Sequence, residues 1–98
     1  IIGPINNQSW GMLKKITLEW IQEAPDEVEA NYHHAFALYK LGKFVSAKRI
    51  LKKVIKKNKK HALAYLYLYK ISNKENQKDD VSYYKSRVLE LDDSLMDK

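Results

Sequence analysis

The amino-acid sequence predicts an all-α fold, an antiparallel helix-pair solenoid of about five helices. Three observations support this prediction. Apolar residues recur along the chain at the i, i+3, i+4, i+7 spacing that places them on one face of a helix. Glycine, proline or polar stretches interrupt this spacing where one helix would end and the next begin. The apolar pattern also returns at a fixed interval of about 34 residues, which is typical of stacked helix pairs.

The stretch 28–61 shows the repeating unit in its clearest form. A first helix is expected over 28–41, and Gly42 follows at the place where a helix end favours a left-handed residue. A second helical run then resumes. Its apolar residues recur with the period of a helix: Phe44, Ala47, Ile50, Leu51, Val54 and Ile55. The unit is therefore expected to be a helix–turn–helix pair.

The same apolar pattern lies on both sides of this unit. A forward shift by the length of the unit places Ala47 on Val81 and Val54 on Val88, and a backward shift places Val54 on Trp20. No insertion is needed in either direction. The single domain 1–98 is therefore divided into three parts: 9–27 as the second helix of a truncated repeat, 28–61 as a complete repeat and 62–95 as a divergent repeat.

The first part is expected to hold one helix only. Ser9 is its candidate N-cap, an amphipathic run follows over 10–21, and Pro25 discourages further helix. Residues 1–8 are expected to be an irregular lead-in, because they contain Gly-Pro and Asn-Asn pairs. At the other end, 96–98 would be the first residues of a further repeat. Since a lone second helix lacks its packing partner, we expect the chain to be part of a longer repeat protein.

These spacings resemble the tetratricopeptide repeat family, whose 34-residue unit has a small residue in its first helix, a glycine at the turn, apolar positions in its second helix and a proline near its end. In the central unit the small residue, the glycine and the apolar positions fall on Ala35, Gly42, Ala47, Leu51 and Val54. The preceding part matches at Trp20 and Pro25, and the following part at Tyr65, Leu68, Val81 and Val88. The resemblance covers about residues 9–95 and implies a right-handed superhelix.

Several positions depart from the family pattern. His34 stands where leucine is usual, and Lys59 stands where the helix-stopping proline is usual. In the last repeat Tyr69 replaces the small residue and Lys85 replaces an apolar one, so that repeat is expected to be looser. Its turn lacks glycine, although Asn76 at the same place tolerates a left-handed conformation.

The segment 62–69 allows an alternative. Its sequence, ALAYLYLY, alternates in a way that would also suit a strand. Alanine and leucine favour a helix, and the repeat places the segment on a leading helix, so we expect a helix there.

Composition and charge limit the classes of function. The chain of 98 residues has no cysteine, which excludes a disulfide framework and a thiolate metal site, and no apolar run is long enough to span a bilayer. The net charge is +6, yet residues 28–61 hold ten lysines and arginines against Glu29 alone. A local basic surface is therefore expected rather than a generally cationic protein. The compartment is left open, with the cytoplasm favoured.

No constellation typical of catalysis is present, so we expect no enzyme activity, no cofactor and no metal site. Adjacent helical residues point about 100° apart, so His33 and His34 cannot chelate one metal. His34 is expected to be a hydrogen-bonded packing residue. The carboxylate clusters are explained by helix dipoles and solvated faces.

The resembled family binds partner peptides or helices on the concave side of its superhelix, which the leading helices line. Here those positions carry more aromatic residues than one packing face needs. The resemblance therefore implies a non-catalytic protein–protein interaction scaffold that holds a peptide or helix of a partner protein, preferably acidic, in an aromatic groove with a basic flank. The candidate partner-binding residues are Tyr32, His33, Phe36, Tyr39, Lys40, Leu66, Tyr67, Lys70 and Lys74.

The lysine-rich helix over 47–60 supports an alternative function, the binding of nucleic acid or an anionic surface. Helical period places many of its lysines opposite the apolar residues, where a solenoid carries solvated charge, and no aromatic residue lies between them to stack on bases. Nucleic acid is therefore not the favoured partner. Self-association through the face that carries Trp10 and Trp20 is a third alternative.

Overall fold

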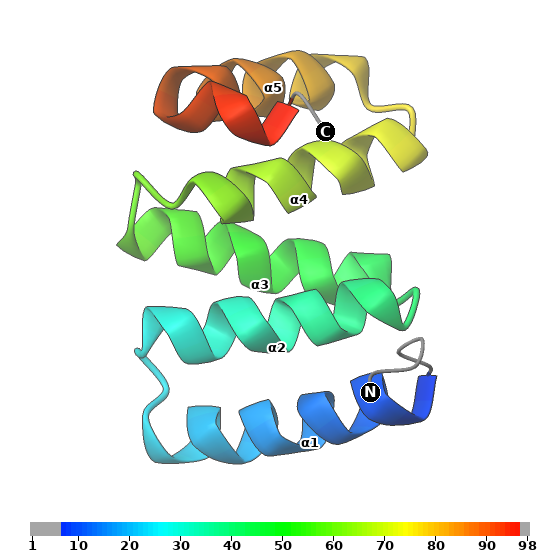
Figure 1. Cartoon of the computed structure of the whole chain (residues 1–98), viewed down its shortest axis with the longest axis vertical. Helices are drawn as coiled ribbons and strands as arrows, with labels where there is room; N and C mark the ends of the chain where they lie inside the picture. The colour runs from blue at the N-terminus through cyan, green and yellow to red at the C-terminus, as the bar shows by residue number, and fades with distance from the viewer. Residues whose placement is uncertain (1–6, 97–98) are drawn as a thin grey trace. The chain divides into compact units, whose positions relative to one another are not determined.

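The computed structural model describes residues 7–96, and in this range the chain forms helices and turns without a strand (Figure 1). All-α structure was the prediction, and it is confirmed. Five α-helices are followed by one short 3₁₀ helix. They are α1 (Asn7–Glu23), α2 (Val28–Lys40), α3 (Phe44–Lys57), α4 (Ala62–Lys74), α5 (Lys78–Asp92) and η1 (Asp93–Met96).

The chain divides into two compact units. Unit 1 is Ile1–Ile50 and contains α1, α2 and the first half of α3, while unit 2 is Leu51–Lys98 and contains the remaining elements. In unit 1, α1 packs against α2, and the two run in opposite directions (Figure 1). In unit 2, α4 packs against α5 in the same antiparallel manner, and η1 returns onto α5.

The helix bounds recur along the sequence at the interval that the apolar pattern suggested. The two leading helices, α2 and α4, have the same length, and their first residues, Val28 and Ala62, are one repeat unit apart. The helices that follow them, α3 and α5, begin at Phe44 and Lys78, which are separated by the same interval. The ends of α1 and α3 also differ by this interval. The recurrence therefore extends from the apolar residues to the helix ends.

The turns after the leading helices are built alike. Gly42 has φ of 81° and Asn76 has φ of 58°, so both take the left-handed conformation that ends a helix, as expected for each. The N–H of Lys43 donates to the carbonyl of Leu38 at 2.9 Å, and the N–H of Gln77 donates to that of Ser72 at 3.0 Å. Each is the 6→1 hydrogen bond of a Schellman motif, in which an N–H donates to a carbonyl five residues earlier. The motif satisfies carbonyls that the helix end leaves without partners.

The turns before the leading helices also match, although only one contains proline. The N–H of Glu27 donates to the carbonyl of Ala24, and the N–H of His61 donates to that of Asn58. Lys59 thus occupies the place of Pro25 without changing the turn. Asn31 supports the first of these turns, since its Nδ2 donates to the carbonyl of Pro25 at 3.0 Å.

Small and aliphatic residues form the buried centre of each unit. In unit 1, Ala30, Ala35 and Ala37 of α2 are fully buried, which allows α1 to approach closely. In unit 2, α4 and α5 are held by fully buried aliphatic side chains and one nearly buried tyrosine. These are Leu68, Ile71, Val88 and Tyr84.

Three expectations about helix ends are wrong. Ser9 is not an N-cap, because α1 begins two residues earlier at Asn7, and the expected irregular segment is therefore shorter. A serine cap contributes about 1 kcal/mol, which further helical turns can exceed. The rest of that segment, 1–6, lies outside the described residues. Met96 does not begin a further helix either, since α5 ends at Asp92 and Met96 closes η1. The segment 62–69 is helical, as expected, and its strand alternative is excluded.

Candidate functional site

Aromatic rings from α1 and α2 gather on one surface of unit 1. The ring of Trp10 meets that of Phe36 edge to face at 5.3 Å, and the ring of Trp20 stacks on His33 at 6.4 Å, both measured between ring centroids. Tyr32 lies between these two pairs, at 5.3 Å from His33 and 6.3 Å from Phe36. We call this row of five rings the aromatic surface. It joins candidate partner-binding residues of α2 to the tryptophans of α1.

A lysine accompanies this surface. Nζ of Lys40 lies 5.6 Å from the centroid of Phe36 and 5.7 Å from that of Trp10, within the range of a cation–π interaction. Lys40 itself is exposed. One side of its ammonium group is therefore held by the rings, and the other faces solvent, where it can meet a carboxylate.

Burial divides the predicted residues of α2 into three groups. Tyr32 is 7% exposed and belongs mainly to the packing of unit 1. Phe36 and Tyr39 are half-buried, and His33 and Lys40 are exposed. The ring of Tyr39 contacts that of Phe44 at 5.5 Å, and burial raises the pKa of its hydroxyl above 10.0. A partner can reach His33 and Lys40 fully, but Phe36 and Tyr39 only at their edges.

Sequence reasoning did not assign Trp10 and Trp20 to the partner-binding surface. The apolar face that carries both tryptophans was instead expected to be covered by a further helix. In the structure Trp10 is half-buried against Phe36, whereas Trp20 keeps 40% of its surface exposed. The signal was available in the repeat, because Trp10 takes the place of Phe44, whose ring also contacts a leading helix.

In unit 2 the predicted residues lie on α4. Leu66 is 8% exposed, Tyr67 is half-buried, and Lys70 and Lys74 are exposed. Nζ of Lys70 lies 5.5 Å from the ring centroid of Tyr67, so a lysine again covers an aromatic ring of a leading helix.

A hollow of about 430 Å³ opens beside these residues of α4. Leu66 and Lys70 line one side of it, and Leu95 and Met96 of η1 line the other. The unexpected 3₁₀ helix thus supplies an apolar wall. An apolar side chain with a neighbouring carboxylate would fit such a hollow.

His34 is buried, and Thr17 of α1 is its hydrogen-bond partner. The distance between its Nδ1 and Oγ1 of Thr17 is 2.9 Å, and His34 is 8% exposed. Oγ1 of Thr17 also lies 2.8 Å from the carbonyl of Leu13, so the hydroxyl either donates to that carbonyl and accepts from a protonated Nδ1, or donates to Nδ1 itself, according to the tautomer of His34. Burial lowers the pKa of His34 below 6.5; a hydrogen bond with the backbone of Lys14 opposes this, and the charge of Lys14 adds a smaller lowering. The predicted packing role of this residue is confirmed.

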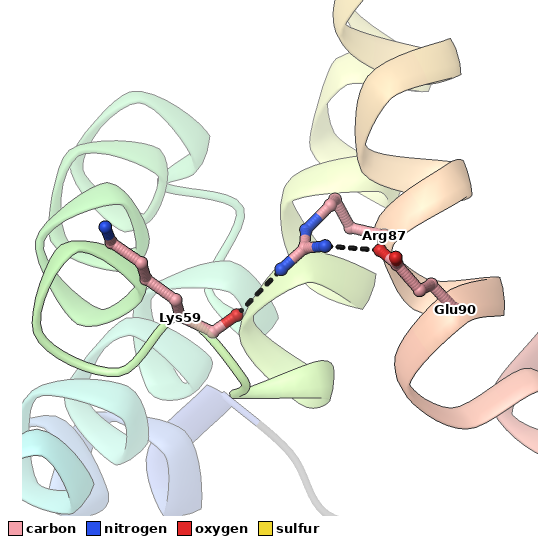
Figure 2. Close-up of polar contacts among 3 residues, drawn as sticks. All are labelled: Lys59, Arg87 and Glu90. Carbon is pink, nitrogen blue, oxygen red and sulfur yellow. Dashed lines mark hydrogen bonds and ion pairs between the residues drawn. The ribbon is translucent and has the colours of Figure 1, made fainter.

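The exposed lysines of α3 lie beside a second hollow in unit 2. Its volume is about 420 Å³, and Lys52, Lys56, Lys59 and Arg87 line it together with Tyr65 and Tyr83. Figure 2 shows how Arg87 is held: its guanidinium donates to the carbonyl of Lys59 at 3.1 Å and pairs with Glu90. The guanidinium also lies 5.2 Å from the ring centroid of Tyr65. Glu90 offsets part of the positive charge there.

Two other features, a metal site and a membrane-spanning helix, were searched for among the described residues. Between residues 7 and 96 no three side chains among histidines, aspartates and glutamates are grouped so that they could hold a metal ion. In the same part of the chain no helix combines the length and the apolar character needed to cross a membrane.

Comparison with known proteins adds no family. No protein-family model and no curated protein matches the sequence.

Proposed function

We propose that the protein is a non-catalytic protein-interaction module that binds an apolar, acidic peptide segment or helix of a partner protein. The observation that carries this proposal is the lysine placed over aromatic rings on each leading helix. Lys40 covers Phe36 and Trp10 in unit 1, and Lys70 covers Tyr67 in unit 2. Such pairs combine contact area with a charge that selects carboxylates.

The partial exposure of the same surface supports the proposal. An aromatic ring that only packed helices together would be buried, yet Trp20 is 40% exposed and stacks on the exposed His33. Exposed aromatic groups beside positive charge are typical of binding surfaces. The hollow beside Leu66 and Lys70 adds a place for one apolar side chain of the partner.

We also propose that the repeats build a tetratricopeptide-like, right-handed superhelix. The recurrence of helix bounds at the repeat interval and the paired left-handed turns at Gly42 and Asn76 support this arrangement. In such a superhelix the leading helices would line the concave side and would present their aromatic and lysine residues to one peptide.

The experiment is a peptide selection followed by affinity measurements. A random-peptide phage library is selected on the immobilised chain, and an enriched peptide is titrated by fluorescence polarisation. Peptides that combine aromatic or aliphatic residues with aspartate or glutamate are expected. Trp20→Ala, Lys40→Glu and Lys70→Glu should each weaken binding about tenfold or more, as expected for central contacts.

Lys53→Glu is the matched control, because Lys53 is an exposed lysine of α3 outside the proposed surface. The affinity of this variant for the selected peptide should stay within about twofold of that of the unchanged protein, since distant exposed charges contribute little at physiological salt. Equal weakening by Lys53→Glu and Lys40→Glu would mean that only total charge matters, and the proposed surface would be wrong.

A second candidate function is the binding of nucleic acid or an anionic surface by α3. The observation that favours it is the hollow lined by Lys52, Lys56, Lys59 and Arg87. Lys52→Glu with Lys56→Glu should then abolish binding to single-stranded DNA or to anionic lipid vesicles at low salt. Absence of any such binding by the unchanged protein would remove this candidate.

A further inference from the structure

A third hollow lies entirely within unit 1, away from the aromatic surface. Its volume is about 320 Å³, and it opens where α1, α2 and the start of α3 meet. Lys14 of α1, Lys43 and Arg49 line it, together with His34 and Ser46. Three aliphatic side chains complete its wall, and no carboxylate lines it.

The positive charges around this hollow have no counter-ion in the described structure. Within residues 7–96 neither Lys14, Lys43 nor Arg49 takes part in an ion pair. Three like charges that share one concave surface repel one another, and the low-dielectric walls strengthen their field. An anion that entered the hollow would relieve this repulsion.

His34 gives the hollow a buried polar group. Its Nδ1 is turned to Thr17, so the opposite edge of the ring, which carries Nε2, is the part left to line the hollow. In the part of the chain that the structure describes, Nε2 has no hydrogen-bond partner, and the residue is 8% exposed. Among the described residues the buried side-chain atom without a partner is Oγ of Ser72, so Nε2 of His34 reaches solvent, and a ligand atom in the hollow would take the place of water there.

We propose that this hollow binds a small phosphate monoester, with Lys14, Lys43 and Arg49 around the phosphate and Nε2 of His34 as a further hydrogen-bond partner. A phosphate dianion carries enough charge and enough acceptor oxygens to meet two lysines, a forked guanidinium and the Ser46 hydroxyl together. Chloride can meet only one or two of them.

The size and the apolar part of the hollow restrict the ligand further. A volume of 320 Å³ holds about ten water-sized groups, each taking about 30 Å³. The phosphate would occupy the part that the cations line, and an apolar body of about one ring would contact the aliphatic wall. Phenyl phosphate has these dimensions and serves as the probe.

The protonation of His34 supplies a readout that a purely structural histidine would not show. Without a ligand, burial is the main cause that lowers the pKa of His34, a hydrogen bond with the backbone of Lys14 partly opposes it, and the charge of Lys14 lowers the pKa again, so the neutral imidazole is favoured. The charged groups that line the hollow with it are Lys14 of α1, Lys43 of the turn before α3 and Arg49 of α3. A bound dianion reverses the sign of this field and favours the imidazolium. Binding should therefore take up a proton near neutral pH and strengthen as the pH falls.

The experiment titrates the whole chain with phenyl phosphate, inorganic phosphate and sodium chloride at constant ionic strength. NMR follows the ring protons of His34, and calorimetry in two buffers of different ionisation enthalpy measures proton uptake. Phenyl phosphate should shift the His34 signals saturably and bind more tightly than inorganic phosphate, and chloride should give no saturation. Arg49→Gln and Lys43→Gln should each weaken phenyl phosphate about tenfold or more, the loss expected for one hydrogen bond to a charged group.

Lys53→Gln is the control, because Lys53 is exposed on α3 and does not line the hollow. It should leave the affinity for phenyl phosphate unchanged. The proposal is overturned if phenyl phosphate gives no saturable shift at His34, if it binds no better than inorganic phosphate, or if Lys53→Gln and Arg49→Gln lose the same affinity. Since Arg49 and Lys43 are exposed, their variants should keep the fold, and a circular dichroism melt of each verifies this.

Discussion

Two glycine-to-alanine substitutions should change stability in opposite directions. Gly42 is in the turn after α2 with φ of 81°, whereas Gly11 lies inside α1 without a positive φ. Among residues 7–96 a Cβ built on either glycine meets no atom of another part of the chain within 4 Å, so neither substitution causes a clash there. The difference between them is therefore purely conformational, and it tests the left-handed turn that the repeat requires.

The magnitudes follow from backbone preferences. At Gly42 alanine costs about 1–2 kcal/mol for the left-handed conformation, and restriction of the unfolded chain returns about 0.4–1 kcal/mol. Gly42→Ala should therefore destabilise the protein by about 1 kcal/mol, which is about 4–8 °C in Tm for a chain of this size. Gly11→Ala should stabilise it by about 0.5–1 kcal/mol, because alanine is the better residue inside a helix.

Urea denaturation followed by far-UV circular dichroism measures both variants. A third variant, Asn76→Gly, places glycine in the matching turn of unit 2 and should change stability by less than about 0.5 kcal/mol, since glycine and asparagine both adopt this conformation. If Gly42→Ala were as stabilising as Gly11→Ala, the turn after α2 would not be left-handed, and the equivalence of the two turns would fail.

Three further predictions concern side chains. Oγ of Ser72 is fully buried and has no hydrogen-bond partner among the described residues, so Ser72→Ala should raise the free energy of unfolding by about 1 kcal/mol in urea denaturation; a loss of stability would contradict the assigned burial. The folded state lowers the pKa of His34 below 6.5, so neutral His34 contributes fully to the stability of the folded protein above pH 6.5. This contribution is lost as the pH falls from 6.5 towards the pKa of His34 in the folded state. Between the folded-state and unfolded-state pKa values of His34, the free energy of unfolding of the unchanged protein should fall by up to about 1.4 kcal/mol per pH unit relative to that of His34→Gln. Denaturation at several pH values measures this difference, and parallel plots of stability against pH for the two proteins would refute it. Arg87→Gln removes the bond to the Lys59 carbonyl and should lower the urea midpoint of unfolding, whereas Lys85→Gln on the same helix should leave it unchanged.

The all-helical fold could be predicted from the sequence because helical periodicity and turn residues recur at matching positions of the repeat. Gly42 and Asn76 are the two residue types that adopt positive φ most readily, and they stand where helical periodicity breaks off. His34 on an otherwise apolar helix face required a hydrogen-bond partner, and burial of that face made packing the natural role. Local chemistry decided each of these features.

The features that sequence reasoning missed depend on contacts between distant residues. No local pattern distinguishes Trp10, which packs against Phe36, from Trp20, which remains 40% exposed. The 3₁₀ helix that ends at Met96 follows α5 directly, and no turn residue stands between them to indicate it. The basic hollow in unit 1 combines residues of α1, α2 and α3 whose separation in sequence hides their proximity.

The central claim is that the aromatic and lysine residues of α2 and α4 bind a partner peptide. Its most direct test is an NMR map of the whole chain with a selected acidic peptide. Shifts should concentrate at Trp20, His33, Lys40, Tyr67 and Lys70, while the exposed lysines of α3 should keep their signals. Shifts confined to α3, or an unchanged spectrum at peptide concentrations that saturate capture, would contradict the account.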